Sequence, residues 1–438
     1  MLFISRLSLN LFMNFHEDFL HFIWQFRLFS TSELYTTQGE RLLILQTGTL
    51  NKNAGPDFSK AKLLIGSTTW VGNVEIHLKS SDWLLHQHQL DKAYDNVILH
   101  VVFENDKPIY RSDNTLVPTL VLKHLFSEQL FLNYQQLISN ANDFPCQKHI
   151  GDVDEFLIHN FLSRVLVERL ADKSTEVYEH LANLKNDWDE AFYHLMAKNF
   201  GFKVNAVPMQ MLAQSLPQQL FAKHKNNPLQ IEALIFGQAG FLNQEFQEAY
   251  PQSLKREYLF LQKKYDLVPL DVSVWKFLRM RPQNFPTLRL AQFAALILNS
   301  NHLFAKILAI DEVKDLQKIF EDLPVNLFWK NHYHFNKPTL NVNLQLGKKS
   351  IENLLINSLS LAMFAYGKAS DQQKYVDKSL VLLENLPAEK NAIIEQFTRF
   401  NVKVKSAFYS QAILHLKKKY CNEKKCLNCG VGIKIFKH

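Results

Sequence analysis

Two acidic residues, Asp57 and Glu75, are spaced so that they could share a divalent cation. Asp57 opens one apolar run, and Glu75 lies 18 residues later in a second run that continues through His77 and Lys79. Because side chains alternate between the faces of a strand, we expect Glu75, His77 and Lys79 on one face. Carboxylates bind Mg²⁺ or Mn²⁺, and such an ion polarises a phosphate and lowers the pKa of bound water. The pattern predicts a catalytic phosphodiesterase site with Asp57 and Glu75 as metal ligands and His77 and Lys79 as basic groups.

The histidines of the same stretch indicate a second kind of site. His77, His86, His88 and His100 all lie within it, and imidazole is a common zinc ligand. A zinc-dependent hydrolase is therefore an alternative. We expect the rings of His86 and His88 to diverge in a loop or short helix, so that both need not bind one ion. His100 interrupts an apolar strand and is expected to be a buried histidine satisfied within the core.

The surrounding periodicity predicts an α+β protein with a small mixed sheet. An amphipathic helix with an aromatic face is expected first, and its Glu17 or Asp18 is a further acid that could lie near a metal, although a solvated face is the simpler reading. Strands and a closing helix follow. In chain order, the expected segments are a helix at 16–29, strands near 42–46, 61–65, 69–79, 96–103 and 115–122, and a helix at 127–140.

The order of these segments and the Pro-Asp…Glu-x-His pattern resemble the PD-(D/E)XK nuclease superfamily. The resemblance implies a restriction-endonuclease-like fold in which Asp57 and Glu75 hold Mg²⁺. In that superfamily a lysine usually stands two residues after the glutamate, whereas this chain has His77 there. In the superfamily this lysine orients the attacking water, so His77 would have to take that role here. Lys79 follows on the same predicted face.

From Val153 onward the periodicity is helical, which predicts a larger all-α domain. We expect three parts: a nuclease-like domain at 13–145, a helical domain at 146–410 and a basic, cysteine-rich segment at 411–438. Within the helical part, Arg279, Arg281 and Arg289 flank a Pro-x-Asn-Phe-Pro loop that starts a helix. Arginines there suit phosphate contacts, and pairing with carboxylates is the alternative.

Three cysteines close together near the end of the chain predict a metal centre. Cys421, Cys426 and Cys429 have spacing that suits zinc or an iron–sulfur cluster, and Cys146 or His415 could supply the fourth ligand. Reduced thiols in a helical cap are the alternative. Seven lysines against one acid follow from position 417, so Lys417, Lys418 and Lys419 are candidate nucleic-acid contacts.

Composition limits the functional classes. The 438 residues are 47% hydrophobic and 21% charged with a net charge of +7, which is typical of a globular protein and permits a nucleic-acid partner. No apolar run is long enough to cross a membrane, and the first residues make a poor signal peptide, so we expect a cytoplasmic protein that starts at Met13. A non-catalytic nucleic-acid-binding or scaffolding protein is the alternative from another class.

Four longer phrases carry a whole-chain resemblance: NAGPDFSKAKLLIG, GNVEIHLKSSDWLLHQH, RPQNFPTLRLAQ and YCNEKKCLNC. They resemble bacterial proteins grouped as domain-of-unknown-function family 2851. The resemblance implies a bacterial cytoplasmic protein of the Bacteroidetes type and no particular activity.

Overall fold

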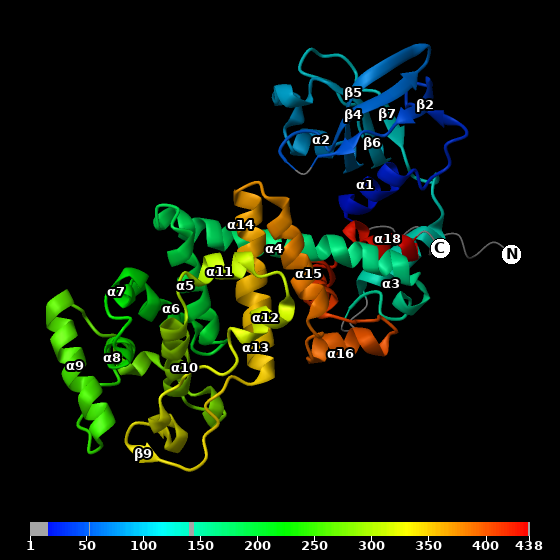
Figure 1. Cartoon of the computed structure of the whole chain (residues 1–438). Coiled ribbons are helices and arrows are strands. Elements are labelled where there is room, and N and C mark those ends of the chain that lie inside the picture. The colour runs from blue at the N-terminus through cyan, green and yellow to red at the C-terminus, as the bar shows by residue number, and fades with distance from the viewer. Residues whose placement is uncertain (1–15, 52, 140–143, 437–438) are drawn as a thin grey trace. The chain divides into compact units, whose positions relative to one another are not determined.

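The computed structural model describes residues 16–51, 53–139 and 144–436 (Figure 1). The chain forms two compact units. The first, here called the sheet unit, comprises Met1–Leu157 and Lys419–His438, and the second, the helical unit, comprises Ile158–Lys418. The expected start at Met13, and Asn142 and Asp143 beside the expected domain boundary, lie outside the described residues.

A mixed sheet forms the centre of the sheet unit. Its strands are β1 (Leu34–Tyr35), β2 (Arg41–Gln46), β3 (Thr49–Leu50), β4 (Phe58–Ile65), β5 (Thr68–Lys79), β6 (Val97–Glu104) and β7 (Thr119–Val121). Neighbouring strands follow the order β1, β2, β4, β5, β6, β7, and β3 pairs with β4. The pairs from β1 to β5 are antiparallel, whereas β6 runs parallel to β5 and to β7.

The hairpin between β4 and β5 fixes where the acidic residues lie. Gly66 turns the chain with a φ of 60°, in the left-handed region that favours glycine. The hairpin register places Phe58 opposite Val74. Asp57, immediately before β4, therefore lies beside Glu75 on β5.

The parallel pairing of β5 and β6 requires a crossover, and this crossover carries two of the candidate histidines. It contains α2 (Asp82–Leu85) and the 3₁₀ turns η2 (His88–Leu90) and η3 (Lys92–Tyr94). Because β6 is buried from Val97 to Val102, the crossover covers a strand with no solvated face. In the β5–β6 register Glu75 lies opposite His100.

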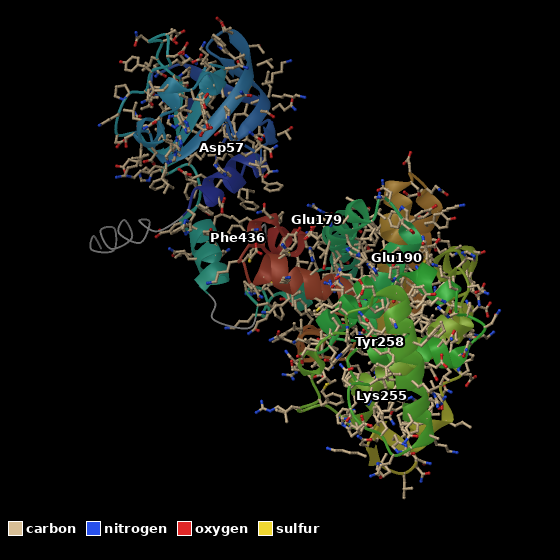
Figure 2. The ribbon with its side chains drawn as sticks, turned by 90° about the vertical axis from the view of Figure 1, so that its left-hand side faces the viewer. Asp57, Glu179, Glu190, Lys255, Tyr258 and Phe436 are labelled. Carbon is tan, nitrogen blue, oxygen red and sulfur yellow. The ribbon has the colours of Figure 1, made fainter. Side chains whose placement is uncertain are left out.

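Helix α1 (Glu17–Phe26) packs against β5 through its aromatic stripe. Phe19, Phe22 and Trp24 are buried, as the helical spacing predicted. The end of the chain returns to this helix, because the ring of Phe436 in α18 (Gly430–Phe436) lies 5.3 Å from that of Phe22 (Figure 2). Phe436 also lies 6.0 Å from Tyr134 of α3 (Glu128–Ser139), so α1, α3 and α18 share one aromatic cluster.

The helical unit is built mainly from α-helices. Its helices are α4 (Glu155–Asn183, which starts in the last residues of the sheet unit's first segment), α5 (Trp188–Phe200), α6 (Ala206–Ser215), α7 (Gln218–Ala222), α8 (Pro228–Gln238), α9 (Ala249–Tyr265), α10 (Pro286–Asn299), α11 (Leu303–Ala309), α12 (Val313–Lys318), α13 (Lys348–Leu354), α14 (Ser360–Ala369), α15 (Gln373–Asn385), α16 (Ala392–Arg399) and α17 (Ala407–Leu416). A π-helical turn, η8 (Leu355–Leu359), joins α13 to α14, and β8 (His332–His334) and β9 (Lys337–Pro338) form a small hairpin.

Helix α8 is largely buried, from Ile231 to Gln238. Asn227 caps it by accepting a hydrogen bond from the backbone N–H of Gln230, and Pro228 occupies the first turn. A Cβ on Gly237 would lie 2.0 Å from Cγ of Tyr258, so the glycine permits the close approach of α9 (Figure 2). The core of the helical unit is thus set by apolar packing.

The predicted α+β class, with an N-terminal mixed sheet and a larger helical region, is confirmed. The predicted edge strand at 115–122 is shorter than expected, since only Thr119–Val121 pairs as β7 at the end of the sheet. Within the described part of the chain, no helix combines the length and apolarity needed to cross a membrane.

Candidate metal centre

Asp57 and Glu75 are bound to each other's backbone across the β4–β5 hairpin. Oε2 of Glu75 accepts a hydrogen bond from the backbone N–H of Asp57 at 3.1 Å, and Oδ2 of Asp57 accepts one from the N–H of Ile76 at 2.9 Å. Glu75 is only 4% exposed. Burial raises the pKa of Glu75, and the neighbouring Asp57 carboxylate raises it further. The two acids of the predicted pattern are therefore neighbours, and their sharing of a cation stays a prediction.

Helix α1 adds a residue that the sequence analysis missed. Nε2 of His21 lies 3.1 Å from Oδ2 of Asp57. Burial opposes the charged form of His21, but the Asp57 carboxylate outweighs this and raises the pKa of the ring. Glu17, one turn earlier, has a pKa raised by burial and feels the charges of His21, His86 and Asp57. The i, i+4 spacing of Glu17 and His21 could have indicated that the two side chains act together, because it places both on one face of the helix.

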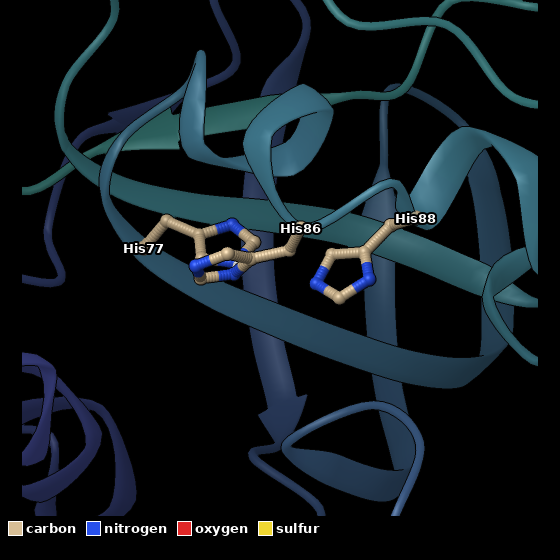
Figure 3. Close-up of side chains that lie close together, drawn as sticks. All are labelled: His77, His86 and His88. Carbon is tan, nitrogen blue, oxygen red and sulfur yellow. Dashed lines mark hydrogen bonds between the residues drawn. The ribbon is translucent and has the colours of Figure 1, made fainter.

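Figure 3 shows three histidine rings that lie close together, those of His77, His86 and His88. One ligand nitrogen from each of His77, His86 and His88 lies within 4.8 Å of the others. Nε2 of His77 is 3.2 Å from Nδ1 of His86 and 3.5 Å from Oε1 of Glu75. Nε2 of His88 is 3.2 Å from the same oxygen. Three nitrogens and one oxygen thus converge from β5 and the following crossover.

The expectation that the rings of His86 and His88 diverge is wrong. Gln87 between them adopts a left-handed conformation with a φ of 60°, which turns the chain so that both rings face His77. The ring centroids of His86 and His88 are 5.5 Å apart. Tyr94 stacks on His88 at a centroid distance of 3.8 Å and fixes that ring. A single backbone conformation creates the cluster, and periodicity does not reveal it.

His100 is buried, as predicted, but it belongs to the cluster. Its Nε2 lies 2.8 Å from Nδ1 of His77. Burial, with a smaller contribution from neighbouring histidines, lowers the pKa of His77 to about 2 and that of His100 to about 3. Both rings are therefore neutral at physiological pH. A proton on Nδ1 of His77, donated to His100, leaves Nε2 of His77 with a lone pair directed at the cluster.

The donor set fits a transition-metal ion. Tetrahedral zinc with nitrogen and oxygen ligands has ligand-to-ligand edges of about 3.3 to 3.5 Å. The three contacts that join His77, His86, His88 and Glu75 are 3.2, 3.5 and 3.2 Å long. Nε2 of His88 is buried, and its contact at 3.2 Å is with Oε1 of Glu75.

Lys79, the fourth predicted catalytic residue, lies apart from this cluster. Its side chain is exposed at the end of β5, and its backbone N–H donates to Oδ2 of Asp82 at 2.8 Å. Among the described residues, no hydrogen bond or ion pair joins the Lys79 ammonium to the histidines. The basic group next to Glu75 is therefore His77.

The predicted nucleic-acid contacts fall into two classes. Arg279 and Arg281 are exposed, whereas Arg289 is 5% exposed and donates to Asn284, Gln292 and Ser350. Arg289 therefore binds neutral acceptors of its own unit, and a phosphate contact of this residue stays a prediction. Lys417 is half-buried, and Lys418 and Lys419 are exposed on the π-helical turn η9 (Lys417–Cys421).

The four cysteines come from two distant segments of the same unit. Cys146 follows α3, and Cys421, Cys426 and Cys429 precede α18. Cys146, Cys426 and Cys429 are each 7% exposed. His415, the alternative fourth ligand, lies in α17 with Nε2 at 3.8 Å from Oδ2 of Asp172.

A second polar cluster, also missed at the sequence level, occurs in the helical unit. Nε2 of His180 lies 2.7 Å from Nδ1 of His194, whose Nε2 is 3.3 Å from Oε1 of Glu190. His180 and His194 line a cavity of about 170 Å³ with Lys173 and Lys198, and Glu190 lines a separate cavity of about 310 Å³. The i, i+4 spacing of Glu190 and His194 was the only local signal.

Comparison with known proteins gives one family. The model of the family described as "Protein of unknown function (DUF2851)" matches residues 17–392. The chain belongs to this family. The matched region contains all the residues of the histidine cluster and Cys146, but ends before Cys421. No curated protein and no solved structure matches the chain.

Proposed function

We propose that this member of the DUF2851 family is a metal-dependent hydrolase that cleaves phosphodiester bonds of nucleic acid at the cluster of Glu75, His77, His86 and His88. One observation carries the proposal. One nitrogen from each of the three histidines lies within 4.8 Å of the others, and Oε1 of Glu75 lies 3.5 Å from Nε2 of His77 and 3.2 Å from Nε2 of His88, which is the spacing of ligand atoms around one metal ion.

The exposure of the cluster favours catalysis over a structural role. Structural zinc sites are closed, whereas catalytic sites keep one position open to substrate. Glu75 and His77 are buried, but His86 is exposed, so one side of the cluster faces solvent. A bound ion there would polarise a phosphoryl oxygen and lower the pKa of a bound water.

The surrounding residues have distinct roles. His100 orients His77 through the 2.8 Å contact, as outer-shell partners of metal ligands do. Asp57 holds Glu75 in place with its backbone N–H. The pair of His21 and Asp57 stands next to the cluster, so His21 can hold or release a proton beside a bound substrate.

The substrate class rests on Asp57, Glu75 and the order of elements. A helix, a three-stranded antiparallel meander, a crossover with a short helix and a parallel strand occur in that order as α1, β2, β4, β5, α2 and β6. This order supports the resemblance to PD-(D/E)XK nucleases, and the net charge of +7 suits a polyanionic substrate. The three imidazoles favour Zn²⁺ or Mn²⁺ over Mg²⁺ as the resident ion, because Mg²⁺ takes oxygen ligands.

The test is hydrolysis by the full chain, stripped of metal and reloaded with Zn²⁺, Mn²⁺, Co²⁺ or Mg²⁺ in turn. Substrates are bis(p-nitrophenyl) phosphate and end-labelled single- and double-stranded DNA and RNA. We expect activity with Zn²⁺ or Mn²⁺ and a loss of more than about 100-fold in His86→Gln. The matched control is His180→Gln, which changes a histidine of the helical unit and should leave activity unchanged.

Two results would contradict the proposal. One is a chain that binds a stoichiometric ion at the histidines yet cleaves none of these substrates with any of the four metals. The other is cleavage that persists in His86→Gln, which would show that the activity comes from another site or from a contaminant. The first result would leave a non-catalytic metal-binding protein.

A further inference from the structure

A cavity of about 310 Å³ lies in the helical unit. Residues of α5, α7, α10 and α11 line it, and Ile231 of α8 forms part of its wall. Close-packed protein interiors leave few voids larger than a water molecule, whereas pockets that bind small molecules measure about 300–1,000 Å³. The cavity is therefore large enough for a small organic ligand.

Aromatic rings form much of the cavity wall. The ring of Phe192 stacks on that of Phe304 at a centroid distance of 5.1 Å. The ring of Tyr193 lies 5.8 Å from that of Phe293 and 6.0 Å from that of Phe221. All five side chains are buried and line the cavity. Because rings pack well against other rings and attract cations to their faces, this wall suits a ligand with a ring and a positive charge.

Tyr193 contributes a polar atom that has no partner within the protein. The residue is 7% exposed, and its hydroxyl is buried without a hydrogen-bond partner in the part of the chain that the structure describes. An unpaired buried hydroxyl costs free energy, so nearly all such groups are hydrogen-bonded. Since Tyr193 lines the cavity, a ligand there can supply the partner.

The cavity lining also includes three carboxylates, and two of them have roles within the fold. Asp187 caps α5 by accepting a hydrogen bond from the backbone N–H of Glu190 at 3.0 Å. Glu190 accepts one from the backbone N–H of Gln218 at 3.1 Å and lies 3.3 Å from Nε2 of His194. The side chain of Asp189 is exposed, and no hydrogen bond or ion pair joins its carboxylate to another described residue. Asp189 is therefore the carboxylate available to a ligand.

Asp189 and Tyr193 lie one turn apart on α5. Phe192 and Met196 share their face of the helix, because the four positions follow the spacing i, i+3, i+4 and i+7. All four residues line the cavity. Side chains at i and i+4 have Cβ atoms about 5–6 Å apart, so one ligand can contact the carboxylate of Asp189 and the hydroxyl of Tyr193 together.

The charges around this face favour a cation over an anion. Partial burial raises the pKa of Asp189, the charge of Asp187 raises it further, and His302 opposes the shift. Lys225 is a basic residue of the lining, but its ammonium donates to the carbonyl of Ser300. A bound cation would reduce the repulsion between the two aspartates, whereas an anion would add to it.

We propose that this cavity binds an organic cation, namely an amine with a ring-bearing apolar body. The ring packs among the aromatic side chains of the wall. The ammonium pairs with the carboxylate of Asp189 and donates a hydrogen bond to the hydroxyl oxygen of Tyr193. The site belongs to the helical unit and is independent of the hydrolase activity proposed for the histidine cluster.

The experiment compares three small molecules that carry the same ring and differ in charge: phenethylamine, phenethyl alcohol and phenylpropionate. Ligand-observed NMR titrations of the full chain give their dissociation constants. We expect the amine to bind at least about 10-fold more tightly than the alcohol, because a charge-assisted hydrogen bond is stronger than a neutral one. The propionate should bind most weakly.

Two variants test the named contacts. Asp189→Asn should weaken binding of the amine by about 10-fold and leave binding of the alcohol unchanged. Tyr193→Phe should also weaken binding of the amine by about 10-fold. Without ligand, the unfolding temperature of Tyr193→Phe should stay the same or rise, because the hydroxyl that it loses has no partner within the protein.

Two controls accompany these variants. Tyr178→Phe also removes one hydroxyl of the helical unit, but that hydroxyl donates to the carbonyl of Ala365 at 3.0 Å and does not line the cavity. Its affinity for the amine should be unchanged. His86→Gln should also bind the amine normally, so a failure of the proposed hydrolase and a failure of this site are distinguishable.

The outcomes are distinct. Preference for the amine that is lost in Asp189→Asn and reduced in Tyr193→Phe supports the site. Equal affinity for the amine and the alcohol, or tighter binding of the propionate, would overturn the assignment of a cation. Binding of none of the three molecules would overturn it, and so would amine binding that is unchanged in both variants.

Discussion

Each unit of this protein contains a group of histidines with a glutamate, and the two groups differ in geometry. In the sheet unit, nitrogens of His77, His86 and His88 converge around Oε1 of Glu75. In the helical unit, His180 contacts His194 at 2.7 Å, and His194 contacts Glu190 at 3.3 Å, so the three side chains form a chain of contacts. A group of side chains that converges on one point can bind an ion there. A chain of side chains forms successive hydrogen bonds instead. Residue type alone does not distinguish them.

The largest difference between the groups should be in metal affinity. Replacing His88 by alanine removes a buried nitrogen at 3.2 Å from Glu75, so the affinity of the chain for Zn²⁺ should fall by more than about 100-fold, or about 2.7 kcal/mol. Replacing His194 by alanine should leave that affinity unchanged. Competition with a chromophoric chelator measures both. Equal losses in the two variants would show that the comparison is wrong.

The two units should also respond to acid in opposite directions. His77 and His100 stay neutral when folded, with pKa values near 2 and 3 against 6.5 in the unfolded chain. The contribution of these two neutral histidines to the free energy of unfolding is complete above pH 6.5. It decreases as pH falls, by about 2.8 kcal/mol in total at pH 5.5 in metal-free protein. Burial raises the pKa of Glu232 in the helical unit from 4.5 to about 7. The contribution of protonated Glu232 to the free energy of unfolding is complete below pH 4.5 and is lost as pH rises through 7.

Hydrogen exchange read segment by segment by mass spectrometry separates these effects, because it reports each unit on its own. Protection of β5 and β6 should fall between pH 6.5 and 5.5, and protection of α8 should not. His100→Gln should remove about half of the pH dependence in the sheet unit. A parallel decline in both units, or an unchanged slope in His100→Gln, would contradict this assignment.

A smaller effect is expected at Arg289, which the sequence suggested as a phosphate contact. Arg289→Met leaves the oxygens of Asn284, Gln292 and Ser350 without their donor and should lower the free energy of unfolding by about 2 kcal/mol. Arg281→Met, at an exposed position, should change it by less than about 0.5 kcal/mol. Urea denaturation compares the two variants, and a neutral Arg289→Met would show that its network contributes nothing.

The smallest expected effect concerns the turn that brings the rings together. Gln87→Gly relieves a left-handed backbone conformation and should raise stability by about 0.5 kcal/mol while leaving Zn²⁺ affinity within about 2-fold. Gln87→Val, which disfavours that conformation, should weaken zinc binding. Thermal unfolding with and without zinc measures both. Stronger zinc binding by the valine variant would show that the turn does not create the cluster.

The sequence predicted the sheet well because its strands have strong hydrophobic patterns. The runs that became β4, β5 and β6 alternate or are continuously apolar, and the Asp57–Glu75 pairing followed from the hairpin between them. His21 was missed because its position beside Asp57 depends on how α1 packs against β5, and this packing cannot be read from the sequence. The convergence of His86 and His88 depends on the φ of one residue, Gln87, which residue type does not indicate. The burial of Arg289 could not be predicted, because burial of its helix, α10, is a tertiary property.

The return of residues 419–436 to the sheet unit has a consequence for biosynthesis. The 261 residues Ile158–Lys418 are translated between the two segments of that unit, which takes roughly 13 to 52 s at about 5–20 residues per second. Throughout that interval the side of α1 that later contacts Phe436 is not covered by α18. The helical unit can therefore complete its folding on the ribosome before the sheet unit does, and a nascent chain stalled before Lys419 should need a chaperone to shield its first helix.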